Sequence, residues 1–428
     1  MTAQPPPKDP KAPDDCQRTV RPSLRDHRFA ALLVAEAVNS VGSWASAIAL
    51  WGFAAYRFNA SPTGLSLLII CWAAPSAVLS PFLGVAVDRL GARRALIAAY
   101  LLGAGAALGL AAADSLPTLY ILAVLAGIAT AMAGPASGAL PPQIVAPDGL
   151  LAANSLLGGA SEFGQVLGPL VASAALALSG FRAAFLIDAA TFAVGVAALI
   201  PLPARRPPPE ARTSWMRELA EGFRIVTRQK PLRLMLLIGT AVSFTSGAFL
   251  VVEPLYARHV LHRPPSQFAL FEAAAGIGAL LTGFALPRLG SILDRPWTLG
   301  LATSAYGLAA CLFVGTTWVA VAYTGAFMWG VSGMIFWVVK LTATQRLAAS
   351  EAHGRVISLN SAAGSVADTL GLAVAGIAIT ALGVRLGAFA LAAVPIVAGL
   401  ATASALARCL RQGSPMPSGQ HSTPIRAD

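Results

Sequence analysis

Long uninterrupted apolar stretches are the feature of this sequence that most restricts its fold. A helix needs about 20 predominantly apolar residues to cross a bilayer, and stretches of that length recur along the whole chain between short segments rich in Gly, Pro or Arg. Only 11% of the residues are charged and 56% are hydrophobic, against roughly 25% and 45–50% in soluble domains. The sequence therefore predicts an all-α membrane protein embedded in the lipid bilayer.

We count twelve such stretches and predict twelve transmembrane helices. Their expected bounds are 29–56, 63–87, 95–113, 117–139, 151–178, 183–202, 233–257, 267–286, 297–314, 317–341, 356–381 and 386–407. The segment 1–28 is Pro-rich and charged without apolar periodicity, which predicts a disordered cytoplasmic tail rather than a signal peptide. A second cytoplasmic tail is expected over 408–428.

The distribution of Lys and Arg predicts the orientation. With the N-terminus inside, 24 of the 30 Lys and Arg residues fall on the cytoplasmic side, where positive residues are retained. We therefore expect both termini in the cytoplasm. The net charge of +11 follows from this topology and gives no reason to expect nucleic-acid binding. The four cysteines are scattered without a CxxC pair, so we predict neither a disulfide framework nor a metal site, and no cofactor.

An internal repeat divides the chain into halves. GVAVDRLG at 84–91 parallels GFALPRLG at 283–290, each at the end of the second span of a set of six. Such a repeat predicts an N-terminal six-helix bundle over 29–202 and a C-terminal six-helix bundle over 233–407, pseudo-symmetric and with a substrate site between them. The basic segment 203–232 is the expected cytoplasmic linker. Its Trp215, Leu219, Phe223 and Val226 fall at helical spacing, which predicts an interfacial amphipathic helix.

The loop between the second and third spans resembles the signature of the major facilitator superfamily. The residues that carry this resemblance are Gly84, Asp88, Arg89, Gly91, Arg93 and Arg94. Further residues make the chain similar to the twelve-span drug:proton antiporters that include macrolide and enterobactin exporters. These are Asn39, Gly42, Trp44, Ala153, Asn154, Asp188, Gln345, Arg346, Gly354, Arg355 and Val356.

The resemblance implies that Asp88 meets the start of the eleventh span, near Arg355, and closes an inner gate. A carboxylate is stabilised at a helix N-terminus, and glycines permit sharp turns and close helix packing. The alternative is a solvated loop that only sets topology. In the second repeat Pro287 stands where the acid would be, which predicts asymmetric gating.

Ionisable residues inside spans are costly and are expected to serve transport. Glu36, Asn39, Ser40 and Ser43 form one polar stripe on the first span. Burial penalises the charged carboxylate, so Glu36 is a candidate for proton coupling, with neutral packing of the carboxyl as the alternative. Asn39 and Ser43 are expected to line the substrate cavity.

Two further carboxylates are coupling candidates. Glu162 lies beside Ser161 and Gln165 on the fifth span, ahead of Gly164, Gly168 and Pro169, which resemble part of the drug-antiporter motif; Gln165 is expected to line the cavity. Asp368 lies on one helical face of the eleventh span with Ser361 and Ser365. Packing alone would also explain both. We expect a structural role for Asp188 on the sixth span. Glu253 and Glu272 are expected to be interfacial carboxyls, with an outer-gate role as the alternative for both.

The tenth span presents Trp329, Gly333, Phe336, Trp337 and Lys340 along one helical face. Aromatic rings with one cation are suited to an apolar or aromatic substrate that carries an ionisable group. Bundle packing, or snorkelling of the lysine to the interface, would produce the same spacing.

We therefore expect a secondary active transporter, not an enzyme, that exports small amphipathic compounds in exchange for protons by alternating access. It is expected to act as a monomer in the bacterial cytoplasmic membrane. The chain contains no GxxxxGK[ST], HExxH or GxSxG motif, which argues against direct use of ATP and against a membrane hydrolase. Uptake or facilitated diffusion of a metabolite and a non-transporting sensor remain the alternatives.

Overall fold

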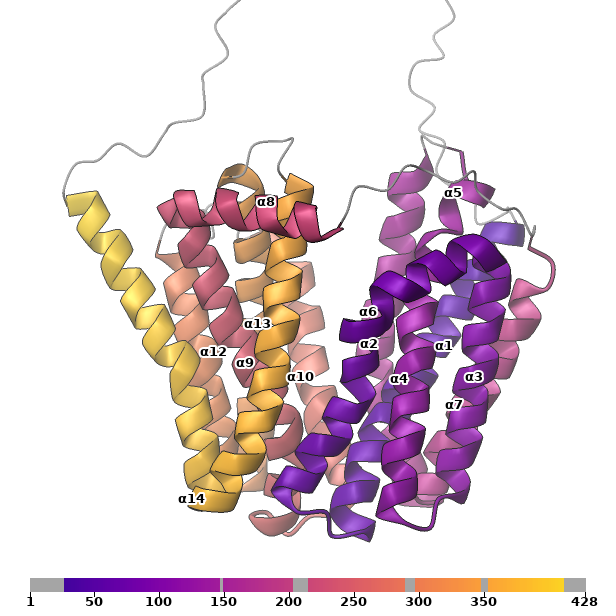
Figure 1. Cartoon of the computed structure of the whole chain (residues 1–428). Helices are drawn as coiled ribbons and strands as arrows, with labels where there is room; N and C mark the ends of the chain where they lie inside the picture. Colours follow the sequence, from indigo (N-terminus) through magenta and orange to yellow (C-terminus); the bar gives the residue numbers. More distant parts are fainter. Residues whose placement is uncertain (1–26, 147–148, 203–214, 289–296, 348–352, 412–428) are drawn as a thin grey trace, which may run out of the picture.

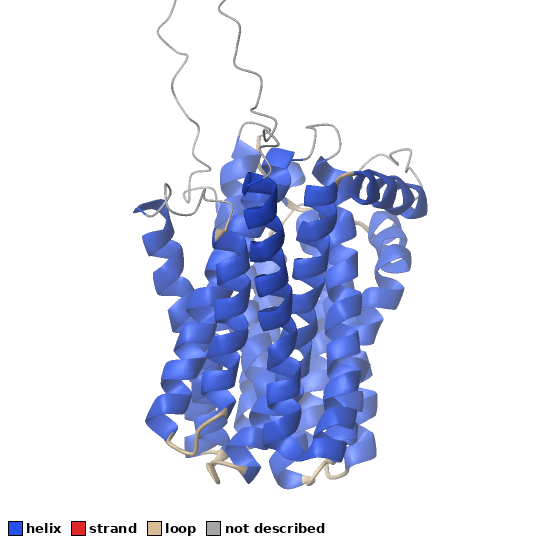
Figure 2. Cartoon of the chain, turned by 90° about the vertical axis from the view of Figure 1, so that its left-hand side faces the viewer, coloured by secondary structure: helices blue, strands red, loops and turns tan. Residues whose placement is uncertain are grey.

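The computed structural model describes residues 27–146, 149–202, 215–288, 297–347 and 353–411. Throughout these residues the secondary structure is helical, and the helices run side by side between short loops (Figure 2). The predicted tails at 1–28 and 408–428 and the first part of the linker lie almost entirely outside the described residues.

The first half of the chain contains six long helices. They are α1 (His27–Gly52, continued by the π-helix η1, Phe53–Arg57), α2 (Pro62–Leu90), α3 (Ala92–Ala112), α4 (Leu116–Gly138), α6 (Leu150–Leu178) and α7 (Phe181–Leu199), with the short α5 (Pro141–Ile144) between α4 and α6. The second half contains α9 (Lys230–His259), α10 (Pro265–Ala285), η3 (Leu286–Arg288), α12 (Thr298–Val314), α13 (Val319–Leu347) and α14 (His353–Arg411). Between the halves lies α8 (Trp215–Arg228).

Nine helical segments of the described chain are long and apolar enough to cross a membrane. Two shorter apolar segments, the first part of α2 (Pro62–Ser76) and α12 (Thr298–Val314), are additional to these. The longest of the nine, Gly354–Ser404, includes Gly383, whose backbone is non-helical with φ 80°. Glycine adopts this conformation without the penalty that a Cβ imposes. α14 reverses its direction at the end of the molecule away from α8 (Figure 1). Two of the expected spans therefore form one chain segment that folds back at Gly383.

The two halves form separate helix bundles, the N-terminal one indigo to magenta and the C-terminal one red to yellow in Figure 1. Within the first, α1 packs against α6 and α7, and α4 packs against α2 and α3; within the second, α14 packs against α9 and α12, and α13 packs against α10 and α12. The bundles meet where α2 contacts α14 and where α6 contacts α10. Corresponding helices of the two halves make corresponding contacts, in agreement with the repeat in the sequence.

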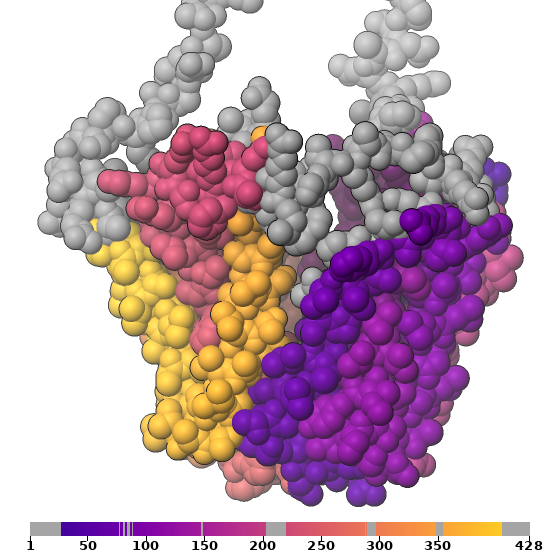
Figure 3. Space-filling view, viewed as in Figure 1, coloured from indigo at the N-terminus to yellow at the C-terminus, as the bar shows by residue number. Residues whose placement is uncertain are grey.

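The hydrophobic core differs between the two ends of the molecule. At the end away from α8, one cluster runs through both bundles and includes Trp51 and Phe185 from the first and Phe249 and Phe313 from the second. Toward α8 the core divides into one cluster inside each bundle. The halves touch at the first end in the space-filling view (Figure 3), and α2 bends away from α14 toward the other (Figure 1). The bundles are therefore joined at the end away from α8.

The linker contains the predicted helix. α8 lies across the end of the C-terminal bundle (Figure 1), where Val226 is buried against Leu232 and Val356. Phe223, expected on the same apolar face, is 57% exposed. An ion pair of 3.2 Å between Arg355 and Glu221 also fastens α8 to the start of α14.

Candidate functional site

A cavity of about 820 Å³ lies between the two bundles. Its wall combines residues of α1, α2 and α6 with residues of α9, α10, α12, α13 and α14. Ile69 and Leu372, which line it, also belong to the core cluster shared by both bundles. The shared core therefore closes the cavity at the end away from α8, and the space-filling view shows a gap between the two bundles on the α8 side (Figure 3).

Five of the candidates predicted from sequence line this central cavity. They are Glu162, Gln165, Trp329, Trp337 and Asp368. They come from α6, α13 and α14, so the fold brings together residues that are up to two hundred positions apart in sequence. The volume is within the roughly 300–1,000 Å³ range of small-molecule sites. The arrangement provides aromatic surface and carboxylates around one space that is large enough for an amphipathic compound.

The polar stripe of α1 lines a second cavity of about 380 Å³ inside the N-terminal bundle. Glu36, Asn39 and Ser43 all face it, and the hydroxyl of Tyr100 donates a hydrogen bond of 3.2 Å to Glu36 Oε1. The Oδ1 atom of Asn39 has no hydrogen-bond partner among the described residues, and Asn39 lines the cavity.

Two indole rings separate the N-terminal cavity from the central one. Trp44 of α1 and Trp72 of α2 line both spaces. Trp72 also makes an edge-to-face contact with Trp51, with 6.4 Å between ring centroids. A rearrangement of these two rings would connect Glu36 to the central cavity.

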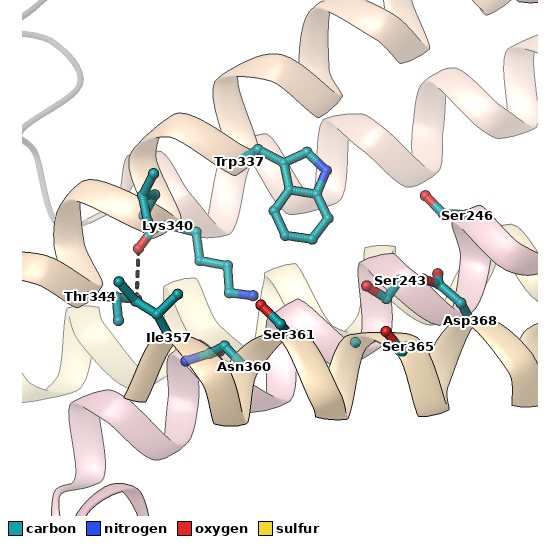
Figure 4. A pocket seen from close by; sticks show the side chains of 12 residues that line it. Ser243, Ser246, Trp337, Lys340, Thr344, Ile357, Asn360, Ser361, Ser365 and Asp368 are labelled. Carbon is teal, nitrogen blue, oxygen red and sulfur yellow. Dashed lines mark hydrogen bonds between the residues drawn. The ribbon is translucent and has the colours of Figure 1, made fainter. Parts of the chain in front are cut away.

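A third pocket, of about 290 Å³, lies inside the C-terminal bundle (Figure 4). Lys340 and Trp337 of α13 face Ser361, Ser365 and Asp368 of α14 across it. Trp337 and Asp368 are shared with the central cavity. The two spaces are therefore adjacent, and they meet at these side chains.

Phe336 does not line any of these cavities, which corrects the prediction for this residue. Its side chain is fully buried in a packing cluster with Ile238, Leu299 and Tyr306. By helical spacing Phe336 lies on the same side of α13 as Trp329 and Lys340. Its ring is buried because α9 and α12 pack against this part of the helix.

Glu253 and Glu272 are not the interfacial carboxyls that their sequence positions indicate. Glu253 is only 2% exposed, and the carboxyl of Glu272 on α10 is within hydrogen-bonding reach of it. Glu272 also lines the central cavity. Two carboxyls in contact hydrogen-bond to each other only when at least one of them carries a proton. The pairing depends on the packing of α9 against α10 and leaves no signal in either helix alone.

Asp188, for which the sequence predicts a structural role, is a buried carboxyl. It is 5% exposed on α7 and accepts a hydrogen bond from Ser43 Oγ at 3.5 Å.

Glycines of the antiporter-like motif bring α6 close to α1: a Cβ on Gly164 would lie 1.9 Å from Ser40 Oγ. The motif therefore serves close packing of α6 on α1.

The loop motif of the first half lies at the junction of α2 and α3. Gly91 ends α2 and begins α3 with φ 84° and ψ 140°, a conformation that is essentially restricted to glycine. Arg93 donates hydrogen bonds to the carbonyls of Leu199 (3.0 Å) and Ile200 (2.6 Å) at the end of α7, while Arg89 and Arg94 are exposed. Gly84 and Asp88 lie within α2, but their side chains are outside the described part of the structure.

The second copy of the motif differs in structure as well as in sequence. α10 ends at Ala285, and Pro287 lies in the short η3 turn, whereas α2 continues to Leu90. Proline has no N–H for the helical hydrogen bond and clashes with the preceding turn. The helical extension that carries Asp88 therefore has no equivalent in the second half.

Arg258 is a bridging residue that the sequence did not identify. From the end of α9 its guanidinium donates hydrogen bonds to the Ala55 carbonyl and the Asn59 side-chain oxygen of the other bundle, and it lies over the ring of Tyr56, 5.8 Å from the centroid. We call Arg258, Ala55, Tyr56 and Asn59, at the end of the molecule away from α8, the outer clamp. A single arginine at a span end carries no sequence signal for this role, because its partners lie about 200 residues away.

Comparison with known proteins agrees with this architecture. The family model of the Major Facilitator Superfamily matches residues 32–371. An MFS-type transporter of Bacillus subtilis (strain 168) is 24% identical, with 89% of this chain and 94% of the relative covered. Macrolide efflux protein A of Streptococcus pyogenes is 25% identical, over 75% of this chain and 82% of the relative. Among solved structures, a bacterial homologue of the human lysosomal transporter Spinster, in an inward-facing and unoccupied conformation, has a TM-score of 0.72 at 14% identity and covers 92% of this chain and 99% of that one.

These features define a multi-pass helical membrane protein with transporter architecture. The chain belongs to the Major Facilitator Superfamily, and exporters are among its relatives.

Proposed function

We propose that this protein is a secondary active exporter of small amphipathic compounds. It works by alternating access of the two bundles about the central cavity, as a monomer in the bacterial cytoplasmic membrane, with twelve spans and both termini in the cytoplasm. The observation that carries the proposal is a cavity built by both halves of one chain, closed at one end and accessible from the other. A single chain supplies the whole site.

The α8 end is the cytoplasmic end in this proposal. α8 and its flanks contain eight Lys and Arg residues between 203 and 233, and positive residues are retained on the cytoplasmic side. The cavity then opens inward, ready to take a compound from the cytoplasm or the inner leaflet. The outer clamp and the shared core would have to open for its release.

Export is supported by the relatives and by local structure. Macrolide efflux protein A and the enterobactin exporter of Shigella boydii, 25% identical over 61% of this chain, are exporters. The partial antiporter motif packs α6 on α1, beside the cavity that contains Glu36. The aromatic wall of the central cavity suits substrates that bury apolar surface.

Proton coupling is proposed for the buried carboxylates. Glu36, Glu162 and Asp368 line cavities, and the Glu253–Glu272 pair adds a second site that would hold one proton between two groups. A bound proton removes a charge that is expensive to move through a closed, apolar end. Exchange of that proton for substrate is the coupling step that we propose.

The test uses purified full-length protein in proteoliposomes. A pH gradient should drive accumulation of a macrolide or an amphipathic dye against its concentration gradient, and Glu36→Gln together with Asp368→Asn should abolish this accumulation while downhill exchange persists. Unchanged gradient-driven transport by the double variant, with Glu272→Gln also unchanged, would refute proton coupling through these groups.

Counterflow in vesicles of known orientation tests the direction. Export predicts that uptake into inside-out vesicles is driven by an acidic lumen. Preferential gradient-driven uptake into right-side-out vesicles would instead establish an importer.

A further inference from the structure

Lys340 is a buried cation in the wall of a cavity. It is 6% exposed on α13, and its ammonium lies over the ring of Trp337, 4.9 Å from the centroid. The side chain crosses α9 at Gly239, where a Cβ would come within 2.2 Å of Nζ. The glycine therefore leaves the space through which the lysine reaches the pocket, which does not fit the alternative that Lys340 snorkels to the interface.

The ammonium forms no ion pair among the described residues, although Asp368 lines the same pocket. In this part of the chain no ion pair or hydrogen bond joins Nζ to another side chain, and its one recorded partner is the indole. A cation–π contact is weaker than an ion pair in a desolvated site, and an unpaired buried charge is costly. A protein keeps such a group where a ligand supplies the missing charge.

The rest of the pocket provides hydrogen-bonding groups and one aromatic face. Ser243, Asn360 and Ser361 line it near the lysine, and Figure 4 shows the ammonium pointing toward Ser361. Hydroxyl and amide donors complement the oxygens of a carboxylate or sulfonate. The face of Trp337 is shared with the central cavity, so a ring stacked there would continue into the larger space.

The carboxylates determine which end of a ligand enters. Asp368 lines both the Lys340 pocket and the central cavity, eight residues beyond Asn360 on α14, about 12 Å at 1.5 Å per residue. Glu162 and Glu272 line the central cavity alone. An anionic group is repelled from that side and attracted toward Lys340. The pocket therefore favours ligands with the acid at the lysine and the apolar part toward the central cavity.

We propose that this pocket is an anion subsite, and that the compounds transported are aromatic or amphipathic acids whose carboxylate, sulfonate or ionised phenol pairs with Lys340. This inference rests on the proposed function, because it names the substrate class of the same transport site. It assigns a charge preference opposite to that of a carboxylate-lined site for cationic drugs.

Three probes that share one ring and differ in charge test this preference. They are 2-naphthoate, its neutral isostere 2-naphthamide, and 2-naphthylmethylammonium. Titration calorimetry on the purified full-length protein at pH 7 should show 2-naphthoate binding about tenfold or more tightly than the amide, and the ammonium compound binding most weakly. Equal binding of acid and amide, or a preference for the ammonium compound, would overturn the proposal.

Variants at one position assign the preference to the lysine. Lys340→Met removes the charge at similar volume and should abolish the difference between acid and amide, whereas Lys340→Arg should retain most of it. Arg224→Gln on the exposed face of α8 removes a cation elsewhere and should leave the preference unchanged. If Lys340→Met melts at the wild-type temperature yet keeps the preference for the acid, the lysine is not the anion site.

Flux measurements separate this inference from the proposed function. If wild-type protein in proteoliposomes exchanges acid and amide equally fast and Lys340→Met does the same, transport stands and the anion subsite fails. If the acid binds with the predicted preference but no probe is exchanged, the site stands and the exporter function fails.

Discussion

Replacing Arg258 by alanine should shift the protein toward the outward-open state. The side chain joins the two bundles through hydrogen bonds to Ala55 and Asn59 and a contact with the Tyr56 ring. Arg258 is half-buried, so we assign the clamp on the order of 2–3 kcal/mol from two charge-assisted hydrogen bonds and one cation–π contact. That energy corresponds to a change of about 30–150-fold in the ratio of molecules with a closed outer end to molecules with an open one.

Spin-label distances measure this shift. In a background without the four native cysteines, labels at Asp114→Cys and Arg263→Cys report the separation of the bundles at the outer end. Arg258→Ala should raise the population with a long distance by the factor given above, up to saturation. Arg57→Ala, which removes an exposed arginine of the same end, should not. Identical distance distributions in Arg258→Ala and wild-type protein would show that the shared apolar core alone keeps this end closed.

Three further substitutions test the junction of α2 and α3. Asp88→Asn should reduce efflux severalfold at unchanged expression, as measured by dye export from cells; normal efflux would reduce the motif to a topology signal. Gly91→Ala should destabilise the protein by about 1–3 kcal/mol because of its backbone conformation, seen as a lower melting temperature, whereas Gly105→Ala, with open space around it, should be neutral or stabilising. Arg93→Gln should lose the carbonyl contacts at the end of α7 and cost about 1–3 kcal/mol in chemical unfolding, but Arg94→Gln, at an exposed position, should change little.

The positions of the helices could be predicted closely from the sequence. The expected span 151–178 corresponds to α6 at Leu150–Leu178, and 265–285 was expected as 267–286. Spans are set by apolar length, which is a local property of the chain. The end of α13 was missed by six residues, at 347 instead of 341, because helices continue beyond the bilayer where hydropathy no longer reports on them.

The candidate site was predicted in part. Helical spacing identifies the face of α1 that carries Glu36 and the face of α13 that carries Trp337 and Lys340, because residues on one face share a period. It does not identify the partner of that face. The proximity of Glu272 to Glu253 and the reach of Arg258 to Asn59 depend on which helices pack together, and neither appears in the pattern of a single helix.

The core that both bundles share at the end away from α8 also matters for the ion gradients across the membrane. A molecule with both ends open would be a water-filled pore and would dissipate the ion gradients of the membrane. In the alternating-access cycle that we propose, opening the outer end exposes apolar surface to water, at about 25 cal/mol per Å², and association of the separate clusters near α8 offsets this cost. In such a cycle closure on one side favours opening on the other, and the cavity needs no dedicated plug against leakage.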